Sequence, residues 1–371
     1  MQYITAFRQG DAGRHLVRQI ARWGAQLADA GRTVFLMEVC GSHTMAISRY
    51  GIRGLLPRQI RLLSGPGCPV CVTDAGYIDA AIQLAEQGAI LATFGDMMRV
   101  PGTDFSLADA RSRGADVRVC YAPYDAMAIA RDHPEREVVF LGIGFETTMA
   151  PVVALVREIE RQSVPNLSVL TAFKLVPPAL HALLGDPEVR IDAFLCPAHV
   201  SAIIGALAYR PIVAQYGVPC VVCGFEPLDI LLGIEQAAAM LCAGKPELVN
   251  SYSRVVRPQG NVAAQALLDA FLEPTDATWR GLGTIAQSGM RLRNAFAHFD
   301  AAVRFDLRET PGTPDPACRC GDVLKGKIAP ADCPLFGGAC TPLHPVGPCM
   351  VSAEGSCAAH HRYGTAEELG P

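Results

Sequence analysis

Three features that assign many proteins to a functional class are missing from this sequence. No apolar run approaches the roughly 18 residues that a membrane-spanning helix needs, and the N-terminus lacks the apolar segment of a signal peptide. The 32 basic and 36 acidic residues give a formal net charge of -4, which is not the footprint of a nucleic-acid-binding protein. We therefore expect a cytoplasmic protein without nucleic-acid or membrane partners.

The motifs of nucleotide binding are also missing. The segment Gly142-Ile-Gly144 starts a Gly-x-Gly pattern, but Thr147 occupies the place of the third glycine. Neither Gly244-Lys245 nor Gly326-Lys327 is followed by Ser or Thr, so the chain has no P-loop. Nucleotide chemistry is therefore not expected on this chain.

Cysteine, in contrast, is abundant, with 14 residues in a chain of 371. In a reducing compartment such a number indicates metal or redox chemistry rather than structural disulfides. One group lies between Met37 and Asp74 and contains Cys40, His43 and a Cys-x-x-Cys pair. A second group of six cysteines lies in a tail rich in Pro and Gly that begins near residue 309.

Short β-rich runs alternate with helical segments from residue 33 to residue 244, and this alternation predicts an α/β fold with parallel sheets. The expected strands cover residues 33–39, 60–64, 89–94, 117–121, 138–143, 168–173, 192–196 and 219–223. A helix is expected over residues 12–30, and residues 245–305 again show helical patterns.

These patterns predict four parts of the chain. They are an N-terminal helix (1–32), a first α/β lobe (33–150), a second α/β lobe (151–244), and a helical segment followed by a cysteine-rich domain (245–371). The first lobe would carry Cys40 and the Cys-x-x-Cys pair, although the segment 33–56 could instead belong to the second lobe.

Chemically active side chains follow the expected strands. Cys40, Cys68, Glu146 and His199 all come directly or shortly after such a strand, and open α/β sheets bind ligands at the carboxyl ends of their strands. Glu146 is then either a helix cap or a proton-transfer group. His199 is either a proton-transfer group or a hydrogen-bonded structural histidine.

The pair Cys68 and Cys71 has the spacing of a redox dithiol, with a zinc half-site as the alternative. Thr73 or Asp74 can cap the next helix, and a position near a helix N-terminus would lower the pKa of Cys71. Cys40 with His43 offers a thiolate and an imidazole, which suit a metal such as iron. A buried, inert thiol is the alternative for Cys40.

The remaining cysteines divide into two sets. Cys220 and Cys223 lie inside an apolar strand, where positions three apart face opposite sides, so we interpret them as structural. Core positions are also expected for Cys120, Cys196 and Cys242. The tail cysteines could hold an iron–sulfur cluster, for which four suffice, or zinc; they are Cys318, Cys320, Cys333, Cys340, Cys349 and Cys357.

Taken together, these segments resemble the HypD family of hydrogenase maturation proteins over about residues 34–363. The matching strings are Met-Glu-Val-Cys-Gly-Ser-His-Thr, Gly-Pro-Gly-Cys-Pro-Val-Cys-Val-Thr, Gly-Phe-Glu-Thr-Thr, Pro-Ala-His-Val-Ser and Gly-Phe-Glu-Pro-Leu-Asp-Ile, with the cysteine-rich tail. The resemblance implies a scaffold that works with the small chaperone HypC, accepts cyanide from HypE and assembles the Fe(CN)2CO unit of NiFe hydrogenases.

The resemblance also implies a structure and a set of sites. One of the two α/β lobes would be thioredoxin-like, and the N-terminal helix would pack with a C-terminal domain that carries a 4Fe-4S cluster. The family's spacing assigns that cluster to four tail cysteines and leaves Cys320 and Cys349 spare; the four are Cys318, Cys333, Cys340 and Cys357. Cys40 would bind a transient Fe with CN and CO ligands. Some members have a histidine where this chain has Met45.

We therefore expect an assembly scaffold with redox activity rather than a turnover enzyme. Cys68 and Cys71 would supply two electrons as they form a disulfide, and His43, Glu146 and His199 would handle protons. The rival reading is an iron–sulfur-dependent thiol–disulfide oxidoreductase that acts on protein disulfides, and a structural zinc scaffold is third. The lack of a stand-alone thioredoxin domain favours the assembly scaffold.

Overall fold

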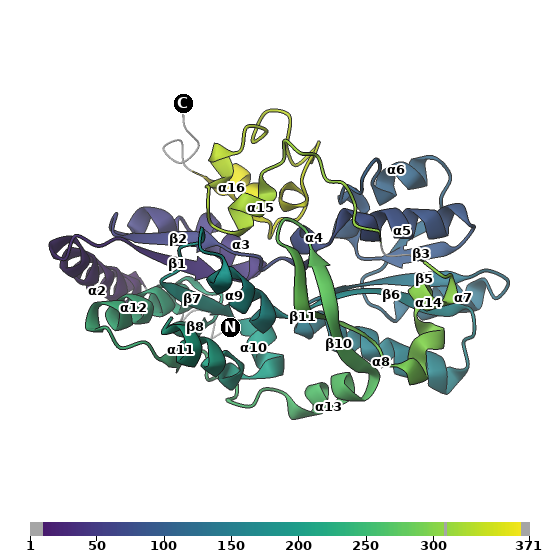
Figure 1. The fold of residues 1–371 in the computed structure, drawn as a ribbon, viewed down its shortest axis with the longest axis horizontal. Helices are drawn as coiled ribbons and strands as arrows, with labels where there is room; N and C mark the ends of the chain where they lie inside the picture. The colour runs from purple at the N-terminus through teal and green to yellow at the C-terminus, as the bar shows by residue number, and fades with distance from the viewer. Residues whose placement is uncertain (1–9, 308–309, 365–371) are drawn as a thin grey trace.

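The computed structural model describes residues 10–307 and 310–364 and contains two β-sheets that lie side by side, each flanked by helices (Figure 1). The C-terminal tail lies over the region between them, at the top of the view. The predicted α/β class with parallel sheets is confirmed. None of the described helices is long and apolar enough to cross a membrane.

The first sheet has five parallel strands in the order β2-β1-β7-β8-β9. The strands are β1 (Val34–Glu38), β2 (Ile60–Ser64), β7 (Ala193–Pro197), β8 (Cys220–Cys223) and β9 (Leu248–Asn250). Side chains on both faces of β7 and β8 are buried, because helices cover both sides of the sheet, as is usual for parallel strands.

The second sheet has six strands in the order β10-β11-β6-β5-β3-β4. The four parallel strands are β3 (Ile90–Thr93), β4 (Val117–Val119), β5 (Val138–Gly144) and β6 (Leu167–Lys174). An antiparallel hairpin of β10 (Leu272–Trp279) and β11 (Gly283–Leu292) extends the sheet beyond β6. All eight strands predicted from the sequence are present, with ends within two residues of the expected ones.

Helices connect these strands and cover the sheets. They are α2 (Gly10–Asp29), α3 (Gly41–Arg49), α4 (Pro69–Val72), α5 (Ala75–Glu86), α6 (Leu107–Ser112), α7 (Asp125–Asp132), α8 (Glu146–Gln162), α9 (Val176–Gly185), α10 (Ala198–Ile204), α11 (Arg210–Tyr216), α12 (Pro227–Ala243), α13 (Val262–Phe271), α14 (Ala301–Arg304), α15 (Cys320–Leu324) and α16 (Ser356–Tyr363). One continuous apolar core includes side chains from both sheets and from the tail.

The division of strands between the sheets differs from the expected lobes. β1 pairs with β7, so residues 34–38 lie with strands from the later part of the chain, in agreement with the alternative given for the segment 33–56, whereas β2 lies outside that segment and joins the same sheet. β6 lies beyond the expected boundary near residue 150 but pairs with β5 in the other sheet. The alternation of strand and helix is the same in both sheets, so the local pattern does not reveal which strands are neighbours.

The expected N-terminal helix is present as α2, but its main contacts are with α12 rather than with the C-terminal domain. The indole nitrogen of Trp23 donates a hydrogen bond of 2.8 Å to Glu235 of α12. Ile20 and Leu27 on the same face are buried. The apolar stripe of α2 therefore covers a face of the first sheet.

The helical expectation for residues 245–305 is wrong over the β10–β11 hairpin. Strand β10 reads Leu-Glu-Pro-Thr-Asp-Ala-Thr-Trp, in which Glu, Pro and Asp are residues that strands usually avoid. Pairing of β10 with β11, which in turn pairs with β6, and packing of Trp279, whose side chain is 1% exposed, override these local preferences. The tip of the hairpin lies beside α4 and α15 and reaches the cysteine-rich tail (Figure 1).

Candidate functional site

Cys40 lies at the carboxyl end of β1 and forms the N-cap of α3. The neighbouring strand β2 ends in a loop in which Gly67 accepts a hydrogen bond of 3.0 Å from the backbone of Gly41. A Cβ atom on Gly67 would stand 2.1 Å from the backbone nitrogen of Cys40, so only glycine fits there. The loop that carries Cys68 is therefore in direct contact with the loop that carries Cys40, as the strand-end argument predicted.

The thiol of Cys40 is buried. Burial, as the larger cause, and the negative charge of Glu354 together raise the pKa of this thiol to about 12. Glu354 belongs to the tail, and its carboxylate accepts a hydrogen bond of 2.6 Å from the hydroxyl of Ser42. A metal that binds Cys40 must displace the thiol proton. A protonated, buried thiol of this kind is a poor nucleophile, and the binding of a metal by Cys40 stays a prediction.

His43 lies on the first turn of α3, buried and oriented by backbone carbonyls. Its Nε2 atom lies 3.1 Å from the carbonyl oxygen of Cys223 and 2.9 Å from that of Gly224, so Nε2 carries the hydrogen. Burial lowers the pKa of His43 to about 4, so the ring is neutral. Its Nδ1 atom is buried and has no partner among the described residues, which leaves a lone pair available to a ligand or a proton.

His199, at the carboxyl end of β7, belongs to the same neighbourhood. Its ring centroid lies 4.2 Å from that of Phe225, and the centroid of His43 lies 4.9 Å from the same ring. Burial lowers the pKa of His199, and the charge of Glu354 opposes this shift. The structure therefore gathers Cys40, His43 and His199, three residues that the sequence singled out, around Phe225 and Glu354.

Cys68 and Cys71 lie at the start of the four-residue helix α4. The backbone nitrogen of Cys71 lies 3.4 Å from the sulfur of Cys68, which acts as the N-cap. Asp74 caps α5, as expected, through its side chain and the nitrogen of Gly76 at 2.9 Å. The expected lowering of the Cys71 pKa is wrong, because burial raises that pKa well above its usual range.

The six tail cysteines come together, and all of them line one small pocket. The other lining residues are Leu335, Phe336, Gly347 and Met350. Cys349, which the spacing left spare, is in hydrogen-bonding contact with Cys71, Cys320 and Cys357. The thiols of the Cys68–Cys71 loop and those of the tail therefore form one continuous group.

The donor set of the tail fits an iron–sulfur cluster. Within the described residues, no three His, Cys, Asp or Glu side chains converge closely enough to hold a single metal ion. A 4Fe-4S cluster instead takes one thiolate for each iron and spreads its ligands over a larger volume. Six soft sulfur donors around a pocket that is otherwise apolar suit such a cluster.

Glu146 lies apart from these groups. It is the first residue of α8, and its Oε1 atom accepts a hydrogen bond of 3.0 Å from the backbone nitrogen of Val176, at the start of α9. Its Oε2 atom has no partner among the described residues, and burial raises the pKa of Glu146 to about 7. The carboxyl group therefore lies between the starts of α8 and α9, and a role of Glu146 in proton transfer stays a prediction.

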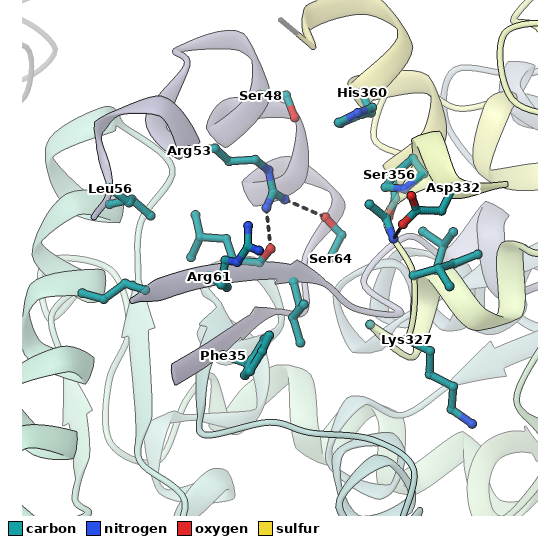
Figure 2. A pocket seen from close by; sticks show the side chains of 18 residues that line it. Phe35, Ser48, Arg53, Leu56, Arg61, Ser64, Lys327, Asp332, Ser356 and His360 are labelled. Atoms are coloured by element: carbon teal, nitrogen blue, oxygen red, sulfur yellow. Dashed lines mark hydrogen bonds between the residues drawn. The ribbon is translucent and has the colours of Figure 1, made fainter. Parts of the chain in front are cut away.

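A larger cavity of about 560 Å³ lies outside this group of thiols, between the free edge of β2 and the tail (Figure 2). Arg53 crosses its wall and donates hydrogen bonds to the carbonyl of Leu62 at 2.5 Å and to the hydroxyl of Ser64 at 3.1 Å. No cysteine lines this cavity. This cavity is therefore separate from the pocket that the six tail cysteines line.

Two parallel-sheet lobes whose strand ends and tail bring thiols together define a thiol-rich α/β protein. The family model described as "HypD: Hydrogenase formation hypA family" matches residues 14–364. The chain belongs to this family of hydrogenase maturation factors.

Curated relatives agree over the full length. The chain is 46% identical to "Hydrogenase maturation factor HypD" of Azotobacter vinelandii, over 98% of this chain and 97% of the relative. It is 46% identical to the protein of the same name from Cupriavidus necator, over 100% and 99%. Identity to the Escherichia coli HypD is 42%, with 98% of each chain covered.

Sequence reasoning missed the roles of Glu354, Phe225 and Cys349 in this arrangement. Glu354 reaches α3 from 312 residues away in the chain, and no local pattern signals such a contact. Phe225 lies in a Gly-Phe-Glu string that occurs twice in the sequence, at residues 144–146 and 224–226, and this repeat is the signal that could have found it. Cys349 was available as a spare thiol, and a spare cysteine beside a cluster motif is the signal that could have found it.

Proposed function

We propose that this hydrogenase maturation factor is the scaffold on which the Fe(CN)2CO unit of NiFe hydrogenases is assembled. A HypC-type chaperone and Cys40 would hold one iron between them, and a HypE-type protein would donate cyanide. The single observation that supports this best is the direct contact of the Cys40 loop with the Cys68 loop. One site thereby combines a soft iron ligand with a source of electrons.

In this proposal each residue around Cys40 has a different role in binding the iron. The sulfur of Cys40 binds the iron as a thiolate, and its proton leaves as the metal enters. The neutral ring of His43 offers its free Nδ1 atom to that proton or to a ligand of the iron. Glu354 and Phe225 keep the Cys40 helix and the two histidines in place.

In this proposal Cys68 and Cys71 supply two electrons to the same site. When they close to a disulfide, two electrons and two protons leave the pair, and they would reduce a sulfur-bound cyanide on the donor protein to a free thiol and hydrogen cyanide. A 4Fe-4S cluster bound by the tail would supply single electrons from a protein electron carrier. Two such electrons and two protons restore both thiols, and Cys349 lies in contact with Cys71 on that side.

The rival function, a reductase of protein disulfides, is disfavoured by burial. Such an enzyme needs an exposed, low-pKa thiolate to attack its substrate. The side chain of Cys71 is 0% exposed and that of Cys68 is 4% exposed, and burial raises the pKa of Cys71. The dithiol is built for a partner inside the protein rather than for a protein substrate.

Infrared spectroscopy and iron counting on the anaerobic complex with a HypC-type chaperone test the proposal. Wild type should show cyanide and CO stretches, whereas Cys40→Ser should lose them and keep the iron of the tail. The double variant Cys68→Ser, Cys71→Ser should bind the chaperone but fail in maturation, and His43→Ala should weaken the bands. Bands of wild-type intensity in Cys40→Ser, or rapid reduction of a protein disulfide by wild type, would contradict it.

A further inference from the structure

Arg280 occupies an unusual position at the tip of the β10–β11 hairpin. Its side chain is 3% exposed, and Nη1 donates one hydrogen bond of 2.6 Å to the carbonyl oxygen of Pro101. Its Nε atom is buried without a partner, and no carboxylate of a described residue forms an ion pair with it. The structure thus places a permanent positive charge in the interior, compensated by a single carbonyl group.

The tip of the hairpin lies between the two groups of thiols. The backbone nitrogen of Arg280 donates a hydrogen bond of 2.9 Å to the carbonyl oxygen of Val72, the residue after Cys71. On the other side, Gly281 packs directly on Gly321, since a Cβ atom on Gly281 would stand 2.5 Å from the Cα atom of Gly321. Gly321 follows Cys320 in α15, so Arg280 is held between the dithiol helix and the tail pocket.

The charge of Arg280 acts on the tail thiols. Arg280 lies close enough to Cys318 and Cys320 for its positive charge to favour the anionic form of both thiols. Both thiols are neutral when protonated and become anionic only when they bind a metal.

An isolated charge in a protein interior is expensive, and buried cations are therefore normally paired with an anion. No carboxylate of the described residues lies within ion-pair distance of Arg280, and the tail thiolates are the anions that metal binding would create. We propose that Arg280 is the counter-ion of the iron–sulfur cluster of the tail and raises the reduction potential of that cluster. This inference rests on the proposed cluster. It assigns a role to Arg280, which the spacing of the cysteines does not identify.

The physical reason is that each added electron increases the negative charge of the thiolate-bound cluster. A buried cation stabilises the more negative, reduced form most, because charges interact strongly where water is excluded. Charges and hydrogen bonds near the sulfur atoms change the reduction potential of iron–sulfur clusters. Because Arg280 also contacts the dithiol helix, it lies where electrons would pass between the cluster and Cys71.

A redox titration of the anaerobic, cluster-loaded protein, followed by visible absorbance, tests the proposal. Arg280→Met should shift the equilibrium toward the oxidised form at least tenfold, which is a decrease of 59 mV for one electron. Arg280→Lys keeps the charge and should shift it less than threefold. Arg319→Met is the matched control, because Arg319 lies between Cys318 and Cys320 but is 50% exposed and paired with Asp322. Its effect should be small and should vanish at high salt.

Thermal unfolding separates a counter-ion from a structural residue. In the cluster-free protein, Arg280→Met removes an unpaired buried charge and should leave the midpoint unchanged or raise it, whereas in the loaded protein it should lower the midpoint. Equal destabilisation of both forms, or an unchanged potential in Arg280→Met, would overturn the inference. If Arg280→Met does not fold, a shift of tenfold or more in Arg280→Lys would also overturn it. A colourless wild type that carries zinc would instead refute the proposed cluster itself.

Discussion

The hydroxyl of Ser42 donates a hydrogen bond of 2.6 Å to the carboxylate of Glu354 and so joins the Cys40 helix to the C-terminal tail. The contact is tight, because a Cβ atom on the adjacent Gly41 would stand 2.6 Å from the Cβ atom of Glu354. Helices α3 and α16 also pack against each other beside it. The tail therefore forms one wall of the Cys40 site.

A double-mutant cycle on this pair tests that arrangement. Ser42→Ala and Glu354→Ala should each lower the free energy of unfolding, since a hydrogen bond to a charged group contributes about 1.5–3 kcal/mol. Because both changes remove the same interaction, the double variant should lose less than the sum, with a coupling energy of about 1–2 kcal/mol. Urea unfolding measures all four proteins. Additive losses would show that the bond does not hold the tail in place.

Gly67 offers a second test, because its missing side chain is what lets the Cys40 and Cys68 loops touch. Gly67→Ala puts a methyl group 2.1 Å from the backbone nitrogen of Cys40, so the two loops must move apart. We expect a loss of about 1–3 kcal/mol of stability and a loss of iron-bound cyanide and CO in the chaperone complex. Gly54→Ala is the control, since nothing lies within 4 Å of a Cβ atom there. If Gly67→Ala loads iron like wild type, the contact is not needed for assembly.

The parallel strands were predictable because each is a short, mostly apolar run with a turn after it. That pattern also placed Cys40 and Cys68 correctly at strand ends. The placement of residues 33–56 in the second lobe was given as an alternative, but the register of β1 on β7 depends on contacts between segments more than 150 residues apart, which no local pattern shows. For the same reason the lobe boundary near residue 150 does not match the sheets.

Burial explains the remaining differences at the site. The start of a helix lowers a thiol pKa when the thiol is solvated, and the sequence shows the helix start but not the solvent. At Cys71 the surrounding core outweighs the helix, so the pKa rises. The burial of Arg280 could not be predicted from the sequence either, because an arginine in a turn between polar strands is normally exposed. The packing of the hairpin tip on α4 and α15 buries it.

Glu146 predicts a pH dependence of stability. Burial raises the pKa of Glu146 from 4.5 to about 7 in the folded protein, so between these values the folded state holds a proton that the unfolded state has lost. Stability contributed by the protonated carboxyl is therefore complete below about pH 4.5, decreases as the pH rises to about 7, and changes no further above it. The decrease can reach about 3 kcal/mol.

The variant Glu146→Gln isolates this contribution, because its amide does not ionise and its carbonyl can still accept the hydrogen bond from Val176. The difference in unfolding free energy, variant minus wild type, should become more positive by up to about 3 kcal/mol from pH 4.5 to pH 7. It should then stay level to pH 8. Glu158→Gln, on the outer face of the same helix beside Arg161, is the control and should show no such rise. Urea unfolding at half-unit steps of pH measures both differences, and a flat curve for Glu146→Gln would mean that the buried carboxyl is ionised throughout this range.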